Sequence, residues 1–313
     1  MSQSAIPSLL HLHPLAPSSI PAHPALPFPF PVSKEGETPD TRPSLPPFIH
    51  SALTQAHSFV TSTVPKEFTP DPKRRTSPPS TATVKLLSGT LRQTPLHPAS
   101  LASKNKEDKW FARCSVHDDR PAKGTASYEE FVRLLKDDHL SNELEYAPTM
   151  SSVDEIAKWD CDAMEIEGGW SGMTASVALI THTFQPTALI SPRAFLVMII
   201  SAFLPSPSST PTQSDGFITI QLPIHQTLPS HVPRGVIFAN YISVEHVRVL
   251  PQEGKASAAG DDNAPRKIEW TMATSSDSGG LIPGFLQEKG VAKAVVKDVG
   301  LFMKWVEEKR SKG

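Results

Sequence analysis

Residues 268–274 read Ile-Glu-Trp-Thr-Met-Ala-Thr, and Ser-Ser-Asp-Ser-Gly-Gly follows at residues 275–280. A two-residue period places Ile268, Trp270 and Met272 on one face, as in a strand with one apolar side. Beyond the glycines, apolar residues recur every three or four positions, which predicts a long amphipathic helix. Its stripe consists of Val291, Val295, Val299, Phe302 and Val306. This order predicts a terminal helix that packs against a sheet.

The composition argues against several classes of protein. The chain has 313 residues and a formal net charge of −2, without the basic surplus of most nucleic-acid-binding proteins. Its two cysteines, Cys114 and Cys161, are too few for a disulfide framework or a four-ligand zinc site. No signal or membrane anchor is recognisable, because the apolar runs are short. We therefore expect a cytoplasmic protein without metal, cofactor or nucleic-acid partner, with peripheral membrane attachment as the alternative.

Prolines divide the chain into regions. Of 32 prolines, 19 lie in the first hundred residues, where they remove backbone donors and restrict their neighbours. We predict a disordered proline-rich arm over residues 1–44 and one folded domain over residues 45–313. Within the domain, residues 66–82 and 88–108 are predicted to be disordered linker and loop segments. The Pro-Phe-Pro-Phe-Pro run at residues 27–31 is typical of ligands for domains that bind proline-rich segments. A tail that binds no partner is the simpler interpretation.

Helices are predicted on both sides of a series of strands. Apolar spacing indicates a helix over residues 45–64, and a capping box at Ser127 and Glu130 begins another that reaches about residue 139. A short helix is predicted over residues 153–158.

Alternating segments predict an antiparallel meander, since most of them follow one another without an intervening helix. The pair Gly168-Gly169 indicates a hairpin turn. Such a sheet can curl around the terminal helix as a grip and leave an apolar cavity between them. The predicted strands are residues 83–87, 110–117, 160–167, 172–184, 193–203, 215–224, 236–250 and 266–275.

Three longer motifs carry a family resemblance. They are Tyr-Ile-Ser-Val-Glu-His-Val-Arg at residues 241–248, the stretch from Ile268 to Pro283, and Lys-Asp-Val-Gly-Leu-Phe-Met-Lys-Trp at residues 297–305. Shorter matching pieces lie at residues 115–118, 139–146, 180–184 and 190–195. Together they resemble an uncharacterised fungal family with a START-like (StAR-related lipid-transfer-like) domain. The resemblance covers about residues 45–308, with poor matching at residues 66–108.

The resemblance implies an α+β helix-grip fold, in which a curved antiparallel sheet wraps around the long C-terminal helix. It also implies a hydrophobic ligand, such as a lipid, between the two. START domains in general carry an aspartate after the arginine that corresponds to Arg193, but Ala194 stands here, so the local charge pairing is not carried over. The connection at residues 288–290 is shorter than in the family, which predicts a kinked or shortened helix start at Gly290, near the cavity mouth.

Eight residues are predicted to line this cavity. If Arg193 is buried, it requires a carboxylate, for which Glu245, Glu269 and Asp277 are candidates. Arg193 either forms a structural ion pair or anchors the head group of a ligand. The apolar residues either pack in the core or contact the ligand. The predicted lining residues are Arg193, Phe195, Phe238, Ile242, Trp270, Met272, Val295 and Phe302.

No catalytic residue is predicted. The run Asp-Ser-Gly-Gly at residues 277–280 superficially matches a serine-protease motif, but its neighbours differ and no suitable histidine context accompanies it. His182 alternates with apolar residues, which is more typical of a sheet histidine than of a catalytic one. Alternation also places His246 on the opposite face from Tyr241 and Glu245, so these three form no simple catalytic set.

The leading hypothesis is non-catalytic binding of a lipid or other hydrophobic small molecule in the cavity. Transfer between membranes, through transient membrane contact, would extend this function. One alternative is an enzyme of the cyclase or hydrolase kind, which requires an acid–base pair inside the cavity. The other is an interaction scaffold that recruits partners through the proline-rich arm.

Overall fold

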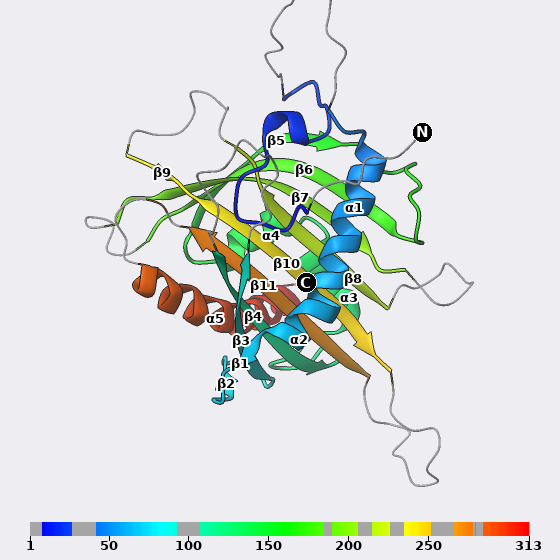
Figure 1. Cartoon of the computed structure of the whole chain (residues 1–313). Helices are drawn as coiled ribbons and strands as arrows, with labels where there is room; N and C mark the ends of the chain where they lie inside the picture. The colour runs from blue at the N-terminus through cyan, green and yellow to red at the C-terminus, as the bar shows by residue number, and fades with distance from the viewer. Residues whose placement is uncertain are drawn as a thin grey trace, which may run out of the picture.

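A large sheet forms the middle layer of the molecule (Figure 1). The structure is a computed structural model that describes residues 8–26, 42–92, 107–184, 190–205, 215–225, 235–251, 266–277, 279 and 284–312. The strands are β1 (Thr69–Pro70), β2 (Arg75–Thr76), β3 (Thr83–Arg92), β4 (Glu107–Asp118), β5 (Met150–Trp159), β6 (Ser171–His182), β7 (Arg193–Phe203), β8 (Gly216–Pro223), β9 (Ile237–Phe238), β10 (Asn240–Leu250) and β11 (Lys267–Asp277). Within the described residues their order is β1-β3-β4-β11-β10-β8-β7-β6-β5, with β2 beside β3 and β9 beside β7. Only β9, paired with β7, runs parallel to its neighbour among these strands.

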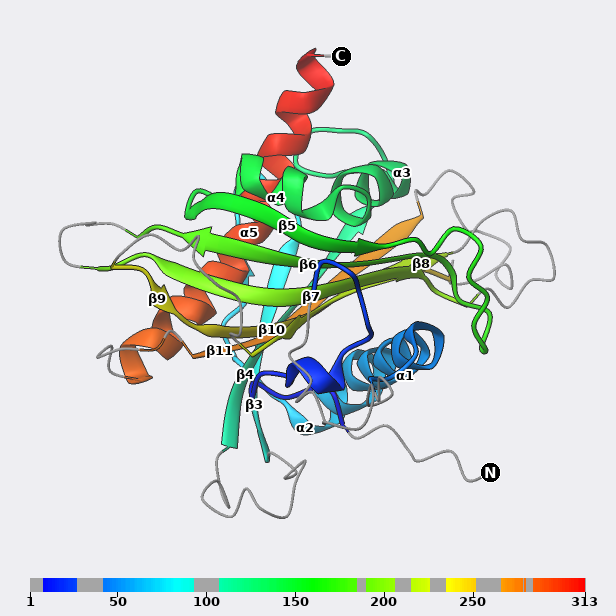
Figure 2. The same ribbon diagram turned by 90° about the horizontal axis from the view of Figure 1, so that it is seen from above.

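Helices cover both faces of the sheet (Figure 2). One face carries α3 (Tyr128–Phe131), α4 (His139–Tyr146) and α5 (Gly284–Lys312). The other carries α1 (Leu45–Ser58) and α2 (Val64–Glu67), joined by a π-helical turn, together with the N-terminal segment 8–26. This arrangement confirms the predicted α+β helix-grip fold. Among the described helices, none combines the length and apolar character that crossing a membrane requires.

The strand and terminal helix predicted from residues 268–310 are both present. Ile268 and Trp270 of β11 are buried on the face that carries α5, while Ala273 packs on the opposite face. Four members of the predicted helical stripe are buried against the sheet, and each contributes about 1.5–3 kcal/mol by leaving water. They are Val295, Val299, Phe302 and Val306. The helix continues unbroken through Gly290, so the predicted shortening there is wrong.

Gly279 lies in the segment that connects this strand to the helix. Gly279 has φ 60°, a left-handed conformation that favours glycine, and an added Cβ would lie 2.9 Å from the Phe238 carbonyl oxygen. Its N–H donates to Asp277 Oδ1 at 3.1 Å. Residues 278 and 280–283 lie outside the described residues.

Residues 8–26 correct the prediction of a disordered arm over residues 1–44. The backbone of Leu15 pairs with β8, since its N–H donates to the Pro223 carbonyl at 2.8 Å and its carbonyl accepts from His225 N–H at 2.8 Å. The leucines between the prolines supply the burial energy, and an extended chain needs few of the donors that proline removes. The buried apolar residues of this segment are Leu9, Leu12, Leu15, Ile20 and Leu26. Residues 1–7 and 27–41, including the Pro-Phe run, lie outside the described residues.

Two local predictions between residues 150 and 170 are wrong. Residues 153–158, predicted as a helix, belong to β5, and residues 160–167, predicted as a strand, form a loop. The cause is a pair of register shifts in β5, between Met150 and Ser152 and between Glu155 and Ala157, which disrupt its two-residue alternation. The predicted glycine turn is present, with positive φ at residues 168 and 169, and it leads into β6.

The linker predictions are also wrong for the described residues. Segment 66–82 packs on α5, where Gly300 N–H donates to Ser77 Oγ at 2.8 Å. A Cβ at Gly300 would lie 2.4 Å from the Pro78 carbonyl oxygen, so only glycine permits this approach. Strands β3 and β4 extend into the predicted loop 88–108, of which residues 93–106 lie outside the described residues.

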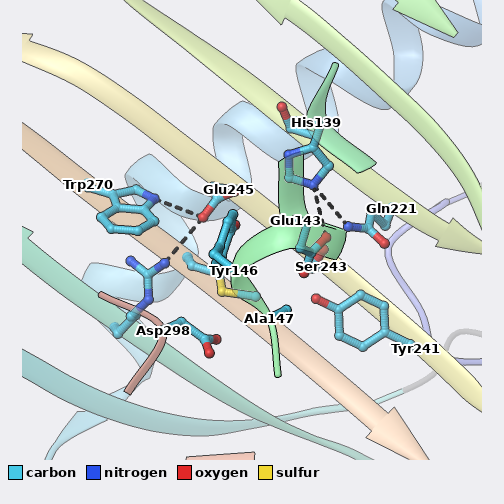
Figure 3. Close-up of a pocket in the computed structure, with 13 residues that line it drawn as sticks. His139, Glu143, Tyr146, Ala147, Gln221, Tyr241, Ser243, Glu245, Trp270 and Asp298 are labelled. Atoms are coloured by element: carbon cyan, nitrogen blue, oxygen red, sulfur yellow. Dashed lines mark hydrogen bonds and ion pairs between the residues drawn. The ribbon is translucent and has the colours of Figure 1, made fainter. Parts of the chain in front are cut away.

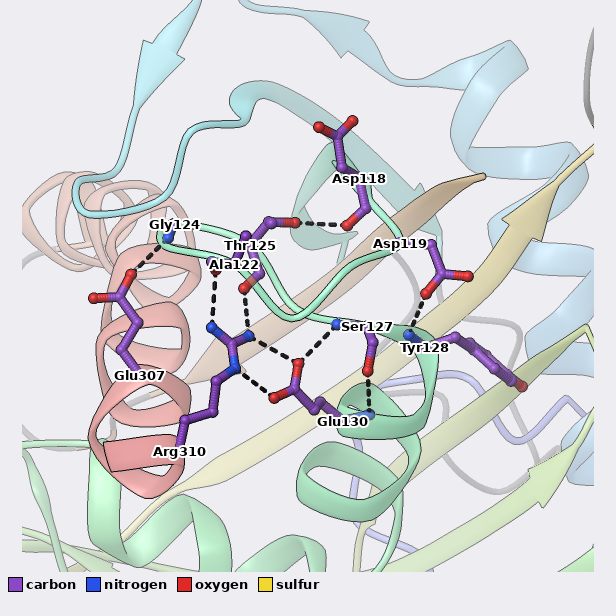
Figure 4. A network of polar contacts seen from close by, with 10 residues as sticks. All are labelled: Asp118, Asp119, Ala122, Gly124, Thr125, Ser127, Tyr128, Glu130, Glu307 and Arg310. Atoms are coloured by element: carbon purple, nitrogen blue, oxygen red, sulfur yellow. Dashed lines mark hydrogen bonds and ion pairs between the residues drawn. The ribbon is translucent and has the colours of Figure 1, made fainter. Parts of the chain in front are cut away.

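The C-terminal end of α5 is fixed by Arg310 (Figure 4). Its Nε and Nη2 donate to the two carboxylate oxygens of Glu130 at 2.5 and 2.8 Å. Its Nη1 and Nη2 also donate to the carbonyls of Ala122 and Thr125 at 2.9 and 2.7 Å. Glu130 is itself part of the predicted capping box with Ser127, so one guanidinium joins the helix end to the start of α3.

Replacing Arg310 with Ala should lower the free energy of unfolding by about 3 kcal/mol, because it leaves the buried Glu130 carboxylate without its counter-ion. The measurement is urea denaturation near neutral pH. Lys309→Ala is the matched control: its partner Glu145 is exposed, so its loss should change the free energy of unfolding much less. Equal losses in the two variants would contradict the assignment.

Candidate functional site

A cavity of about 200 Å³ lies between the sheet, α4 and α5. We call it the outer cavity, and much of its wall is apolar: Met150, Ile180, Phe184, Phe195, Val291 and Val295. It adjoins a smaller space of about 30 Å³, which we call the polar pocket (Figure 3). Both spaces are lined by Glu143, Ala147, Gln221, Tyr241, Met272 and Asp298. The two therefore form one site with an apolar body and a polar end.

Strand alternation decides which side chains reach the polar pocket. On β10, Tyr241, Ser243 and Glu245 line it. The intervening Ile242 and Val244 are buried in the core on the other face of the sheet. A one-residue shift of this strand would exchange the two sets.

Three further elements supply the other ionisable side chains of the polar pocket. From α4 come His139, Glu143 and Tyr146, whose spacing of four and three residues places them on one helical face. Asp298 comes from α5 and Arg113 from β4. Asp138, just before α4, has φ 47° and breaks the predicted helix 128–139, so that α4 starts in a new direction.

The most deeply buried charge of the site is Arg113, which is 1% exposed. Its Nη2 donates to Glu245 Oε1 at 3.2 Å, and its guanidinium carbon lies 3.8 Å from the centroid of the Trp270 ring. Trp270 Nε1–H donates to the same carboxylate oxygen at 2.8 Å. Within the described residues, Arg113 Nε and Nη1 have no hydrogen-bond partner. The charge is thus compensated by one carboxylate and one aromatic face.

His139 connects α4 to β8. Its Nδ1–H donates to the Leu135 carbonyl at 2.7 Å, which leaves Nε2 as an acceptor in the neutral ring. Nε2 lies 3.3 Å from the amide nitrogen of Gln221 and 3.6 Å from Glu143 Oε2. The carbonyl oxygen of Gln221 is buried without a hydrogen-bond partner among the described residues.

Burial shifts the acids of this site toward their neutral forms. It raises the pKa of Asp298 to about 7, although the charge of Arg113 acts in the opposite direction. Burial also raises the pKa of the Glu143 carboxyl, against the influence of His139. The hydroxyl pKa values of Tyr146 and Tyr241 are raised for the same reason. Among the described residues, no group of three or more His, Cys, Asp and Glu side chains is arranged to hold a metal ion.

The predicted lining residues divide into two groups. Phe195, Trp270, Met272 and Val295 line the outer cavity or the polar pocket. The other four line neither space: Arg193, Phe238, Ile242 and Phe302. Of these, Ile242 lies on the opposite face of the sheet, because the wall-forming residues of β10 have odd numbers. Phe302 packs in the core, with its ring 5.2 Å from that of Trp270.

Neither Arg193 nor His182 lines the polar pocket. Arg193 is buried, and its Nη1 donates to the carbonyl of Ser191. Two of its candidate partners pair with other cations, Glu245 with Arg113 and Glu269 with Arg248. His182 lines the outer cavity. Its Nδ1 lies 3.0 Å from Thr149 Oγ1, and burial lowers its pKa to about 4. It is therefore neutral near pH 7.

The acids and the cation of the polar pocket were not predicted as site residues. The segment 139–146 matched the family resemblance, and the i, i+4 and i+7 spacing of His139, Glu143 and Tyr146 indicates a polar helix face. Arg113 lies between the apolar residues of an alternating strand, which predicts its position on the second face. The sequence contains no signal, however, that these two segments meet.

Asp298 should give the stability a measurable pH dependence. Its pKa is about 7 when folded and near 3.8 when unfolded, so the folded protein retains a proton that the unfolded chain releases between these values. The stabilising contribution is complete below about pH 4 and is lost as the pH rises to about 7. Asp298→Asn should therefore exceed the parent in unfolding free energy at pH 8, by on the order of a few kcal/mol, and match it near pH 4. Parallel urea-denaturation profiles across this range would refute the assignment, and Glu308→Gln, on the exposed side of the same helix, is the control.

Comparisons with known proteins agree with this fold. Residues 110–306 match the family described as "Protein of unknown function (DUF3074)". An uncharacterised protein of Schizosaccharomyces pombe is 22% identical over 198 residues, which are 63% of this chain and 67% of that protein. Human STARD10 has a similar structure, with a TM-score of 0.51 at 14% identity over 82% of each chain. Human StAR-related lipid transfer protein 5 gives 0.49 at 10% identity, over 83% of this chain and 99% of that one.

The likeness to STARD10 confirms the expected START-like fold. The S. pombe relative is itself an uncharacterised fungal protein. Because the family match spans more than half of the chain, the protein is a member of the DUF3074 family.

Proposed function

We propose that the protein binds a lipid or other hydrophobic small molecule in the outer cavity, with the polar end of the ligand in the polar pocket. The observation that carries this proposal is the division of the site. Apolar side chains from β6, β7 and α5 enclose one end, and charged and hydroxyl groups converge at the other. Binding sites for amphiphilic small molecules have this construction, because apolar contact supplies affinity and a few polar groups fix orientation.

The volume favours a ligand of moderate size. An engineered cavity of about 150 Å³ in another protein is large enough for benzene. The outer cavity, at about 200 Å³, is somewhat larger. It therefore suits a single alkyl chain or a compact ring system, and a lipid with two long chains requires the wall to move outward.

The first part of α5 is the wall suited to move. Val291, Ala294 and Val295 line the outer cavity from this helix. Its far end is held by the Arg310 contacts, so displacement is easiest at the opposite end. Burying apolar ligand surface contributes about 25 cal/mol per Å² before the costs of association.

Catalysis is a second candidate, favoured by one observation. The polar pocket contains an acceptor nitrogen, on His139, and two acids whose pKa values are raised, Glu143 and Asp298. General acid–base chemistry requires groups of these kinds close together. A bound ligand recovered chemically unchanged after long incubation supports the binding function alone. A ligand recovered in altered form supports the enzyme.

The proposal predicts that Val291→Trp weakens binding of N-phenyl-1-naphthylamine, a neutral apolar fluorophore, at least about tenfold, because the indole fills the outer cavity. Lys293→Trp is the matched control, since Lys293 is exposed on the same helix and does not line the site. Fluorescence titration of the full chain gives both affinities. No binding to the parent protein, or equal affinity in the two variants, would contradict the proposed function.

A further inference from the structure

The polar pocket has more acids than cations. Three carboxyl groups line it, those of Glu143, Glu245 and Asp298, against the single guanidinium of Arg113. Glu245 already pairs with Arg113, and Glu143 lies 3.6 Å from His139 Nε2. The carboxyl of Asp298 lines both the polar pocket and the outer cavity. It is therefore placed to meet the polar end of any molecule that enters.

A second observation points to a ligand that donates hydrogen bonds. Gln221 is 4% exposed and lines the same two spaces, yet its carbonyl oxygen has no hydrogen-bond partner within the described part of the chain. A buried acceptor without a partner loses the hydrogen bonds that water would give it. A donor from the ligand would satisfy this oxygen.

The aromatic side chains favour a positive charge at the same place. Tyr146 and Tyr241 line the polar pocket beside Glu143 (Figure 3). Their hydroxyl oxygens can accept hydrogen bonds from a cationic head. An anionic head would instead join three carboxyl groups. Arg113 Nε and Nη1 lack partners among the described residues, but Glu245 and the Trp270 ring already compensate the guanidinium charge.

We propose that the polar pocket selects the protonated amino group of an amphiphilic amine, with Asp298 as its counter-ion and Gln221 as a hydrogen-bond acceptor. The apolar body of the amine occupies the outer cavity, so this inference rests on the proposed function. It adds the chemical class of the head group: a cationic amine rather than an alcohol or a carboxylate.

The inference carries a pH dependence. A cationic head favours ionised Asp298, whose pKa is raised to about 7 by burial, so amine binding should strengthen as the pH rises through this value. It should weaken again only when the amine itself loses its proton. Asp298 is faced by ionisable groups on several neighbouring elements. They are Arg113 on β4, His139, Glu143 and Tyr146 on α4, Tyr241 and Glu245 on β10, and His182 on β6, with Lys297 beside Asp298 on α5.

The test compares decylamine, 1-decanol and decanoate, which share an alkyl chain and differ in their head groups. Affinities are measured with the full chain by displacement of N-phenyl-1-naphthylamine at about pH 5.5 and about pH 8. We expect decylamine to bind at least about tenfold more tightly than 1-decanol at the higher pH, with a smaller advantage at the lower pH. Decanoate should be the weakest ligand at about pH 8.

Asp298→Asn should abolish the preference for decylamine over 1-decanol, and thermal unfolding checks that it folds. Glu308→Gln, an exposed change on the same helix, should keep the preference. If none of the three compounds binds, the proposed function fails. If 1-decanol binds as tightly as decylamine, or decanoate binds best, cavity binding stands and the amine inference is overturned.

Discussion

A buried guanidinium is the constraint on which this site depends. Arg113 enters the interior on a central strand, where an unpaired charge would be very costly. Glu245 on a nearby strand and the Trp270 ring between them compensate that charge. These three side chains require β4, β11 and β10 to be neighbours in a fixed register, which the sheet order provides. The polar end of the cavity is thus built into the pairing of the sheet.

The remaining acids are held by elements that the sheet does not pair. Glu143 lies on α4 and Asp298 on α5, and these helices close the pocket from the side opposite the strands. Because both helices pack on the same sheet face, small changes in either one alter the surroundings of both carboxyl groups. The proton affinity of the pocket is therefore coupled to the position of the helices that enclose it.

Strong periodicity made much of the fold predictable from the sequence. The alternation around Trp270 and the stripe from Val295 to Val306 predict both faces correctly, and β7 has the predicted bounds. The same reasoning failed for β5, because two register shifts disrupt the alternation of its apolar residues. Leu15 was missed because prolines indicate local disorder, whereas its partners lie about 200 residues further along the chain.

Prediction of the site was limited for a related reason. Trp270 and Met272 could be assigned to the cavity because one strand pattern decides their face. Ile242 was placed on the wrong face, since both parities of β10 include apolar residues. The polar pocket draws on segments as distant as Arg113 and Asp298, and pairing of this kind leaves no periodic signal in either segment.

The contacts of residues 8–26 also bear on where the folding unit ends. The family match covers residues 110–306, which omits α1 and this segment. Both pack in the core that covers the far face of the sheet, where the extended chain around Leu15 adjoins the end of the strand that carries Gln221. The region that matches the family is therefore smaller than the packed unit of this protein. Relatives that vary in the N-terminal segment must cover the same apolar face with other residues.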